Sequence, residues 1–178
     1  MAHSIELLFD EATETVVRRD WTALADAGLP SQGHHRSPTN RPHVTMAVSR
    51  RIDPAVDAQL LEPARLLPLD CRIGAVMVFG HATVSLVRLI VPSAALLELH
   101  GHVSAISAPH QTPGPYPHSQ PGQWTPHVTL CRRLPARDLP AALKALGADD
   151  LVGTFAQLRR WDGDARVDTV IGGRGVLG

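Results

Sequence analysis

Apolar and polar residues alternate along residues 4–9, a pattern that predicts a β-strand. Ile5, Leu7 and Phe9 would lie on one side of this strand, with Ser4 and Glu6 on the other. The chain is therefore expected to begin with a strand that has one buried face and one polar face.

A helix is predicted directly after this strand. Asp10 is a suitable N-cap, and Val17, Trp21 and Leu24 recur at the spacing of one helix face. The helix breakers at 28–30 are expected to end it.

The same two periodicities divide the rest of the chain. A period of two, or a short unbroken apolar run, predicts further strands at 43–48, 72–79, 83–91, 151–161 and 166–171. A period of three to four predicts further helices that begin at Asp53, Ser93 and about Asp138. The stretch 109–126 contains six prolines, so we expect a long loop there, which is a candidate lid.

The sequence Pro-His-Val-Thr occurs twice, at 42–45 and at 126–129, each time in a predicted strand. Alternation places the histidine, the threonine and the second residue after the threonine on one face of each strand: His43, Thr45 and Ala47 in the first copy, and His127, Thr129 and Cys131 in the second. The opposite faces are apolar. Each strand would therefore present an imidazole and a hydroxyl on one side and pack under helices on the other.

The two histidines are 84 residues apart (127 − 43), and the predicted elements repeat at the same interval. The order is strand, helix, breaker-rich loop, His-Val-Thr strand, helix, strand in both copies. This repeat predicts one α+β domain over 1–178 with two pseudo-symmetric lobes that face each other across a cleft. One lobe is expected over approximately 43–107, and the other over 127–178, completed by 1–28.

Charge and cysteine content limit the function classes. Seventeen basic and seventeen acidic residues give a formal net charge of zero, whereas proteins that bind long nucleic-acid duplexes usually carry a basic surface. Cys71 and Cys131 lie in separate apolar runs, which indicates buried, reduced thiols. No signal-peptide pattern and no apolar run of about 20 residues is present, so we expect a monomeric cytoplasmic protein with no membrane contact.

Two histidines can perform acid–base chemistry at neutral pH, because the reference pKa of histidine is about 6.5. Cleavage of a phosphodiester needs one group that activates water, a second that protonates the leaving oxygen, and donors that bind the phosphoryl oxygens. Thr45 and Thr129 are suited to that last role. This chemistry requires neither a metal ion nor another cofactor.

The paired motif resembles that of the two-histidine phosphoesterase superfamily, in the branch of 2'-5' RNA ligases and cyclic phosphodiesterases. The resemblance rests on His43-Val44-Thr45 and His127-Val128-Thr129, each followed by an apolar residue, and on Trp124-Thr125-Pro126 before the second copy. It implies a duplicated fold, α+β, with two lobes of antiparallel sheet and outer helices around a central cleft.

The resemblance also implies site roles and a reaction. His43 and His127 would be the catalytic acid and base, and Thr45 and Thr129 would contact the scissile phosphate. The reaction would be metal-independent: opening of 2',3'-cyclic or 1'',2''-cyclic phosphates, or making and breaking of 2'-5' linkages. The substrate would be a small nucleotide or an RNA end.

Three further residues have two interpretations each. Arg88 interrupts an apolar strand, either as a cation that faces phosphate or as a strand-end charge or partner of Glu6. Tyr116 and Trp124 either stack on a nucleobase or pack the long loop onto the body of the protein.

Two other function classes compete with the phosphodiesterase. Ten histidines would suit a metallohydrolase, but the sequence has no HExxH motif and no clustered carboxylates. A non-catalytic module that binds nucleotides or RNA ends remains the second alternative, and turnover of a cyclic nucleotide in the presence of a chelator would separate the three classes.

Overall fold

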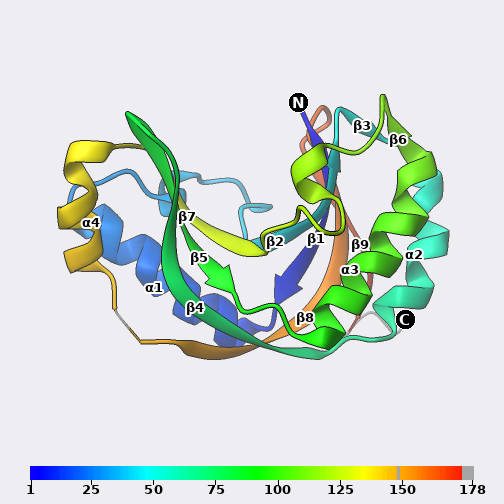
Figure 1. Cartoon of the computed structure of the whole chain (residues 1–178), viewed down its shortest axis with the longest axis horizontal. Helices are drawn as coiled ribbons and strands as arrows, with labels where there is room; N and C mark the ends of the chain where they lie inside the picture. Colours follow the sequence, from blue (N-terminus) through cyan, green and yellow to red (C-terminus); the bar gives the residue numbers. More distant parts are fainter. Residues whose placement is uncertain (148, 174–178) are drawn as a thin grey trace.

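The computed structural model describes residues 1–147 and 149–173, which fold into a mixed α+β structure (Figure 1). The strands are β1 (His3–Phe9), β2 (His43–Ser49), β3 (Arg51–Ile52), β4 (Leu69–Gly80), β5 (Thr83–Ile90), β6 (Gln111–Thr112), β7 (His127–Pro135), β8 (Leu151–Asp162) and β9 (Val167–Gly173). The α-helices are α1 (Glu11–Asp26), α2 (Asp57–Ala64), α3 (Ala94–Ser107) and α4 (Leu139–Ala145). Short 3-10 turns are η1 (Gln32–His34), η2 (Pro54–Val56), η3 (Ala108–His110), η4 (Pro117–Ser119) and η5 (Ala136–Asp138).

Seven strands form one antiparallel sheet in the order β1-β2-β7-β5-β4-β8-β9. The strand β8 also pairs with β1, so the sheet closes on itself. Residues 151–155 of β8 pair with β4, and residues 155–161 pair with β1. The long strands β4 and β8 therefore join the two halves of the molecule, as Figure 1 shows.

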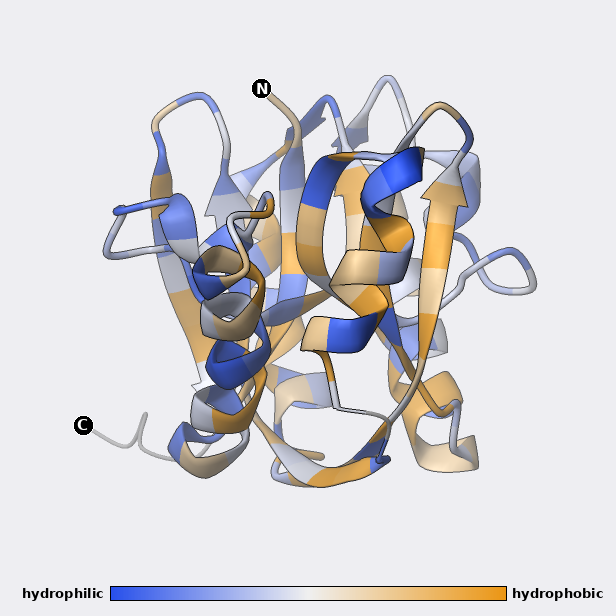
Figure 2. Cartoon of the chain, turned by 90° about the vertical axis from the view of Figure 1, so that its left-hand side faces the viewer, coloured by the Kyte–Doolittle hydropathy of each residue, from blue (hydrophilic) through white to orange (hydrophobic). Residues whose placement is uncertain are grey.

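The helices lie in two pairs at opposite ends of the sheet (Figure 1). Helices α1 and α4 contact each other, and so do α2 and α3, which pack beside β9 and β2. In Figure 2 the helices change between hydrophobic and hydrophilic colours along their length, as expected when one face is buried. The predicted α+β class with an antiparallel sheet is confirmed.

Strand pairing crosses the predicted lobe ranges. Strand β2, which falls within 43–107, pairs with β1 from the N-terminal segment. Strand β7, which falls within 127–178, pairs with β5. Each histidine strand is thus held by a strand from outside its own predicted lobe.

The predicted helix signals act as expected. The Asp10 side chain accepts a hydrogen bond from the Thr13 amide at 2.8 Å, which caps α1. The Ser93 hydroxyl does the same for Leu96 at 3.1 Å in α3. The predicted stripe of α1, Val17, Trp21 and Leu24, is buried, and so are Leu96, Leu99 and Val103 of α3.

Strand β2 contains a β-bulge directly after its threonine. Glu6 of β1 lies opposite Thr45, but the preceding residue Ile5 lies opposite Ala47, so β2 has one extra residue at this point. The extra residue reverses the alternation, and Ala47 joins the buried core. The prediction that Ala47 shares a face with His43 is wrong for this reason.

Strand β7 contains the same irregularity at the same place. Val87 of β5 lies opposite Thr129, whereas its neighbour Leu86 lies opposite Cys131. Cys131 therefore turns to the buried face, where it is fully enclosed, and not to the face of His127 as predicted. Both cysteines of the chain are buried free thiols, in agreement with the prediction.

The proline-rich stretch 109–126 is more ordered than its composition predicts. It contains β6, which pairs with β3, and two 3-10 turns. Two backbone hydrogen bonds connect this stretch to earlier parts of the chain. The Asp53 amide donates to the His110 carbonyl, and the Tyr116 amide donates to the Val48 carbonyl. The edges of β2 and β3 supply backbone partners that a local sequence pattern cannot reveal.

Within the described residues, no helix is both long enough and apolar enough to cross a membrane.

Candidate active site

The two histidine strands meet at a single residue pair, Val44 of β2 and Val128 of β7. Both valines are buried in the core, so the residues before them point to the other side of the sheet. Because the pairing is antiparallel, His43 lies across from Thr129 and His127 across from Thr45 on that side, so the two histidines are diagonal to each other. We call this side the histidine face; the structure brings together on it the four residues that the repeated motif singled out.

Each imidazole is held by the backbone in the same way. The Nδ1 atom of His43 lies 2.7 Å from the Arg41 carbonyl oxygen, and the Nδ1 atom of His127 lies 2.6 Å from the Thr125 carbonyl oxygen. A carbonyl oxygen only accepts, so Nδ1 carries the hydrogen in both rings. The Nε2 atom of each ring is then left to take up or release a proton.

The proline of each motif explains why this geometry occurs twice. A residue that precedes proline is restricted to extended conformations, which applies to Arg41 before Pro42 and to Thr125 before Pro126. The carbonyl two residues before each histidine is therefore presented in a fixed direction. The repeated Pro-His sequence thereby selects one tautomer for both rings.

Beyond the Val44–Val128 pair the two strands diverge, and two indole groups bond to the threonine carbonyls. Trp124 Nε1 donates to the Thr45 carbonyl at 2.8 Å, and Trp21 Nε1 donates to the Thr129 carbonyl at 3.0 Å. These bonds give both threonine carbonyls a side-chain partner from outside the two histidine strands. In the part of the chain that the structure describes, neither threonine hydroxyl is bonded to another residue, so both can bind a substrate.

The surroundings of His127 are apolar and cationic. The Phe79 ring meets the His127 ring edge-on, with 5.0 Å between the centroids. Burial lowers the pKa of His127; the Thr125 carbonyl opposes this, while the positive charges of Arg132, His43 and His118 lower it further. His127 is therefore held toward its neutral form.

Arg132 reaches the histidine face because of the bulge in β7. After the inserted residue, Cys131 is buried and the next side chain, Arg132, is exposed and close enough to affect His127. Its guanidinium has no ion-pair partner among the described residues. Regular alternation assigned Arg132 to the other side, so only knowledge of the bulge could have identified it.

The surroundings of His43 carry carboxylates instead. Glu6 Oε1 lies 3.6 Å from His43 Nε2 and accepts a 2.5 Å hydrogen bond from the Ser4 hydroxyl. Glu6 Oε2 is bound by the Arg159 guanidinium at 2.7 Å, which also binds Asp168 at 2.8 Å. The sequence indicated Glu6 only as a partner for Arg88, and it gave no signal for Arg159, which comes from the far end of the chain.

The structure places Arg88 away from the two histidines. Its side chain is 2% exposed and pairs with Asp20 of α1 at 2.7 Å, on the helix side of the sheet. The guanidinium also donates to the Gly147 carbonyl at 2.7 Å. Of the alternatives considered for Arg88, the buried ion pair is present, with Asp20 in place of Glu6.

The two aromatic candidates differ in position. One face of the Trp124 ring is covered by His100, at 3.8 Å between centroids and 6° between planes. Tyr116 lies beside His118, with 5.9 Å between the ring centroids, and the charge of His118 reaches His127. Trp124 thus packs the loop onto the body of the protein, and Tyr116 contacts a neighbouring side chain of the same loop.

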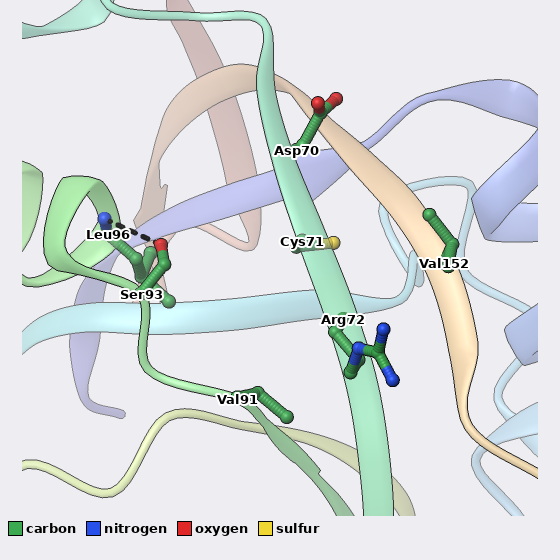
Figure 3. A pocket seen from close by; sticks show the side chains of 7 residues that line it. All are labelled: Asp70, Cys71, Arg72, Val91, Ser93, Leu96 and Val152. Atoms are coloured by element: carbon green, nitrogen blue, oxygen red, sulfur yellow. Dashed lines mark hydrogen bonds between the residues drawn. The ribbon is translucent and has the colours of Figure 1, made fainter.

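A separate pocket lies along β4, beside the start of α3 (Figure 3). Its lining includes Cys71 and the exposed side chains of Val91 and Val152, and none of the predicted site residues. Burial raises the pKa of the Cys71 thiol to about 12, so the thiol is protonated at neutral pH and is no nucleophile. The pocket lining contains no imidazole, in contrast to the histidine face.

Among the described residues, no three His, Cys, Asp or Glu side chains come together in a group that could hold a metal ion.

Comparisons with known proteins agree with this arrangement. The model of the 2'-5' RNA ligase superfamily matches residues 13–168. No curated protein matches the chain.

Solved structures share the fold at low sequence identity. TT0787 of Thermus thermophilus is 16% identical with a TM-score of 0.57, and 96% of this chain and 95% of that chain are covered. Escherichia coli LigT in complex with 3'-AMP is 13% identical with a TM-score of 0.56, covering 94% and 92%. Kluyveromyces marxianus Usb1 with uridine monophosphate is 11% identical with a TM-score of 0.54, covering 96% and 98%.

The position of Arg88 leads to a prediction about stability. Arg88→Gln would leave Asp20 as a largely buried, unpaired carboxylate, so the free energy of unfolding should fall by about 3 to 5 kcal/mol. Urea denaturation measures this change. Arg72→Gln is the matched control, because the Arg72–Asp150 pair is exposed and should contribute less than about 1 kcal/mol. A stable Arg88→Gln variant with weakened substrate binding would instead indicate a role in the site.

Proposed function

Since the chain belongs to the 2'-5' RNA ligase superfamily, we propose that it is a metal-independent phosphodiesterase that acts on 2',3'-cyclic phosphate or 2'-5'-linked nucleotide substrates. The observation that carries this proposal is the matched pair of imidazoles. His43 and His127 lie diagonally across the Val44–Val128 pair, and each has Nδ1 bound to the backbone, which leaves Nε2 for proton transfer. Two such groups can serve as general acid and general base in one reaction.

In the proposed hydrolysis, one neutral imidazole takes a proton from the attacking water as its oxygen bonds to phosphorus. The bond from phosphorus to a ribose oxygen breaks, and the second imidazole, protonated, gives its proton to that oxygen. The hydroxyls of Thr45 and Thr129 would bind the phosphoryl oxygens, on which negative charge increases in the transition state. Ligation would be the same pair of proton transfers in reverse.

Arg132 is a third group that we assign to phosphate binding. Its exposed guanidinium acts on His127, and it can bind the anionic substrate in the same place. We infer a small nucleotide or an RNA end as substrate. Escherichia coli LigT with 3'-AMP and Kluyveromyces marxianus Usb1 with uridine monophosphate are similar folds that contain such ligands, and the zero net charge of this chain does not suit a long duplex.

Turnover of a 2',3'-cyclic nucleotide in the presence of EDTA tests the proposal. We expect activity to be unchanged by EDTA, because two imidazoles need no Lewis acid. His43→Ala and His127→Ala should each lower kcat by about 10²- to 10⁴-fold with unchanged thermal unfolding. His102→Ala, at an exposed position of α3, is the matched control and should retain full activity.

Two outcomes would favour the other classes. Loss of activity with EDTA that a particular divalent ion restores would indicate a metallohydrolase. Nucleotide binding without turnover would indicate a binding module.

The threonine hydroxyls give a milder prediction. Thr45→Val and Thr129→Val each remove one hydrogen bond to a charged phosphate, which corresponds to about 1.5 to 3 kcal/mol, so kcat/KM should fall by about ten- to a hundredfold. Thr45→Ser and Thr129→Ser keep the hydroxyl and should retain most activity. If the serine variants lose as much as the valine variants, the hydroxyls do not bind the phosphate.

Neighbouring arginines offer a matched pair of variants. Arg132→Gln should raise KM by about tenfold or more, because a charge-assisted hydrogen bond to the phosphate is lost. Arg133→Gln removes an equal charge one residue later that does not act on His127, so KM should stay within about twofold. Steady-state kinetics at moderate ionic strength measures both, and equal effects would point to net charge alone.

A further inference from the structure

The two histidine motifs are nearly identical in sequence, but the charged groups around them are opposite in sign. Glu6, Arg159 and Asp168 lie on the side of His43, and they contain two carboxylates and one guanidinium. The charged groups that act on His127 are all cationic: Arg132, His118 and His43 itself. A pair of equivalent histidines is thereby made inequivalent.

Glu6 is positioned by β1 between β2 and β8. It lies opposite Thr45 on one side and opposite Arg159 on the other, so its carboxyl points to the histidine face. The Glu6 side chain is 5% exposed, and its Oε1 lies 3.6 Å from Nε2 of His43. That nitrogen is the one left free for proton transfer.

The Glu6 carboxyl is ionised although it is buried. Burial alone would raise its pKa, but the positive charges of His43 and Arg159 and the hydrogen bonds from Ser4 and Arg159 lower it overall. Arg159 does not cancel the negative charge of this cluster, because it also binds Asp168 at 2.8 Å. With two carboxylates and one guanidinium, the cluster carries a net charge of about −1 beside His43.

No carboxylate pairs with His127 among the described residues. Its ring is partly buried against Phe79, and the nearby charges are positive. Protonation of this imidazole is therefore disfavoured. The neutral ring is the form that can accept a proton.

We propose that Glu6 is a positioning residue that holds a proton on Nε2 of His43, so that His43 is the general acid and His127 is the general base. This inference rests on the proposed function. Glu6 itself neither gives nor takes a proton; its charge stabilises the imidazolium of His43.

The assignment fixes each step of the reaction. His127 Nε2 takes a proton from water while the water oxygen forms a bond to phosphorus. The bond between phosphorus and the ribose oxygen breaks, and that oxygen receives the proton from His43 Nε2. His127 ends as imidazolium and His43 as neutral imidazole, and exchange with solvent returns each to its starting form.

The first test does not depend on turnover. NMR titration of the full unliganded chain with isotope-labelled histidine, with the His43 and His127 signals assigned through single His→Gln variants, should show that His43 loses its proton at a higher pH than His127. The reverse order would overturn the proposal. Because no substrate is present, this result is independent of whether the chain is a phosphodiesterase.

The second test uses Glu6→Gln, which removes the charge and keeps the shape. The loss of an opposite charge beside the proposed general acid should move the alkaline limb of the kcat/KM profile to lower pH. The acidic limb, which reports the base, should move much less. Glu6→Asp keeps the charge and should restore the alkaline limb.

Asp168→Asn separates electrostatics from structure. It removes the other carboxylate of the cluster, which binds Arg159 and makes no ion pair with His43, so the alkaline limb should move less than in Glu6→Gln. Equal shifts in both variants would mean that Glu6 acts only through the packing of Arg159. If Glu6→Gln does not fold, the titration order in the wild-type chain still decides, and absence of turnover with the expected titration order would refute the proposed function alone.

Discussion

The arrangement of the candidate site depends on one point of contact, where Val44 and Val128 pair and then the two strands separate. A longer ladder between β2 and β7 would bond the carbonyls of Thr45 and Thr129 within the sheet. With a single pair, each histidine lies across from the threonine of the other motif, and the Thr45 and Thr129 carbonyls accept hydrogen bonds from two tryptophans. The strand positions of both threonines are thus bonded to groups from α1 and from the proline-rich loop.

Much of this arrangement could be read from the sequence. The repeated Pro-His-Val-Thr motif identified both strands, both imidazoles and the period of the repeat, because all of them are local patterns. Alternation failed at the residues after each threonine. A bulge inserts one residue, and nothing in the composition of a strand marks where this occurs, so Cys131 was placed on the wrong face and Arg132 was overlooked.

The charged partners were also beyond a local pattern. Glu6 and Arg159 are 153 residues apart, and Arg88 and Asp20 are 68 residues apart. Each pair depends on which strands become neighbours and in which register. The pairing of β1 with β8 puts Arg159 on Glu6, while Arg88 lies on the helix side of β5 and bonds to α1. An isolated charge in an apolar strand therefore indicated that a partner exists, but not which one.

A duplicated fold presents a chemical difficulty, because general acid–base catalysis needs one imidazole with a proton and one without. Two copies of the same motif in the same surroundings would favour the same protonation state in both, and mutual repulsion alone would leave the choice between them random. The asymmetry here comes from outside the repeated motif. The strand β1 supplies a carboxylate beside His43, and the bulge of β7 supplies a guanidinium near His127. The backbone of each motif fixes the tautomer in the same way, and in the proposed assignment the flanking charges favour opposite protonation states. The proposed reaction therefore uses both the symmetry of the geometry and the asymmetry of the charges.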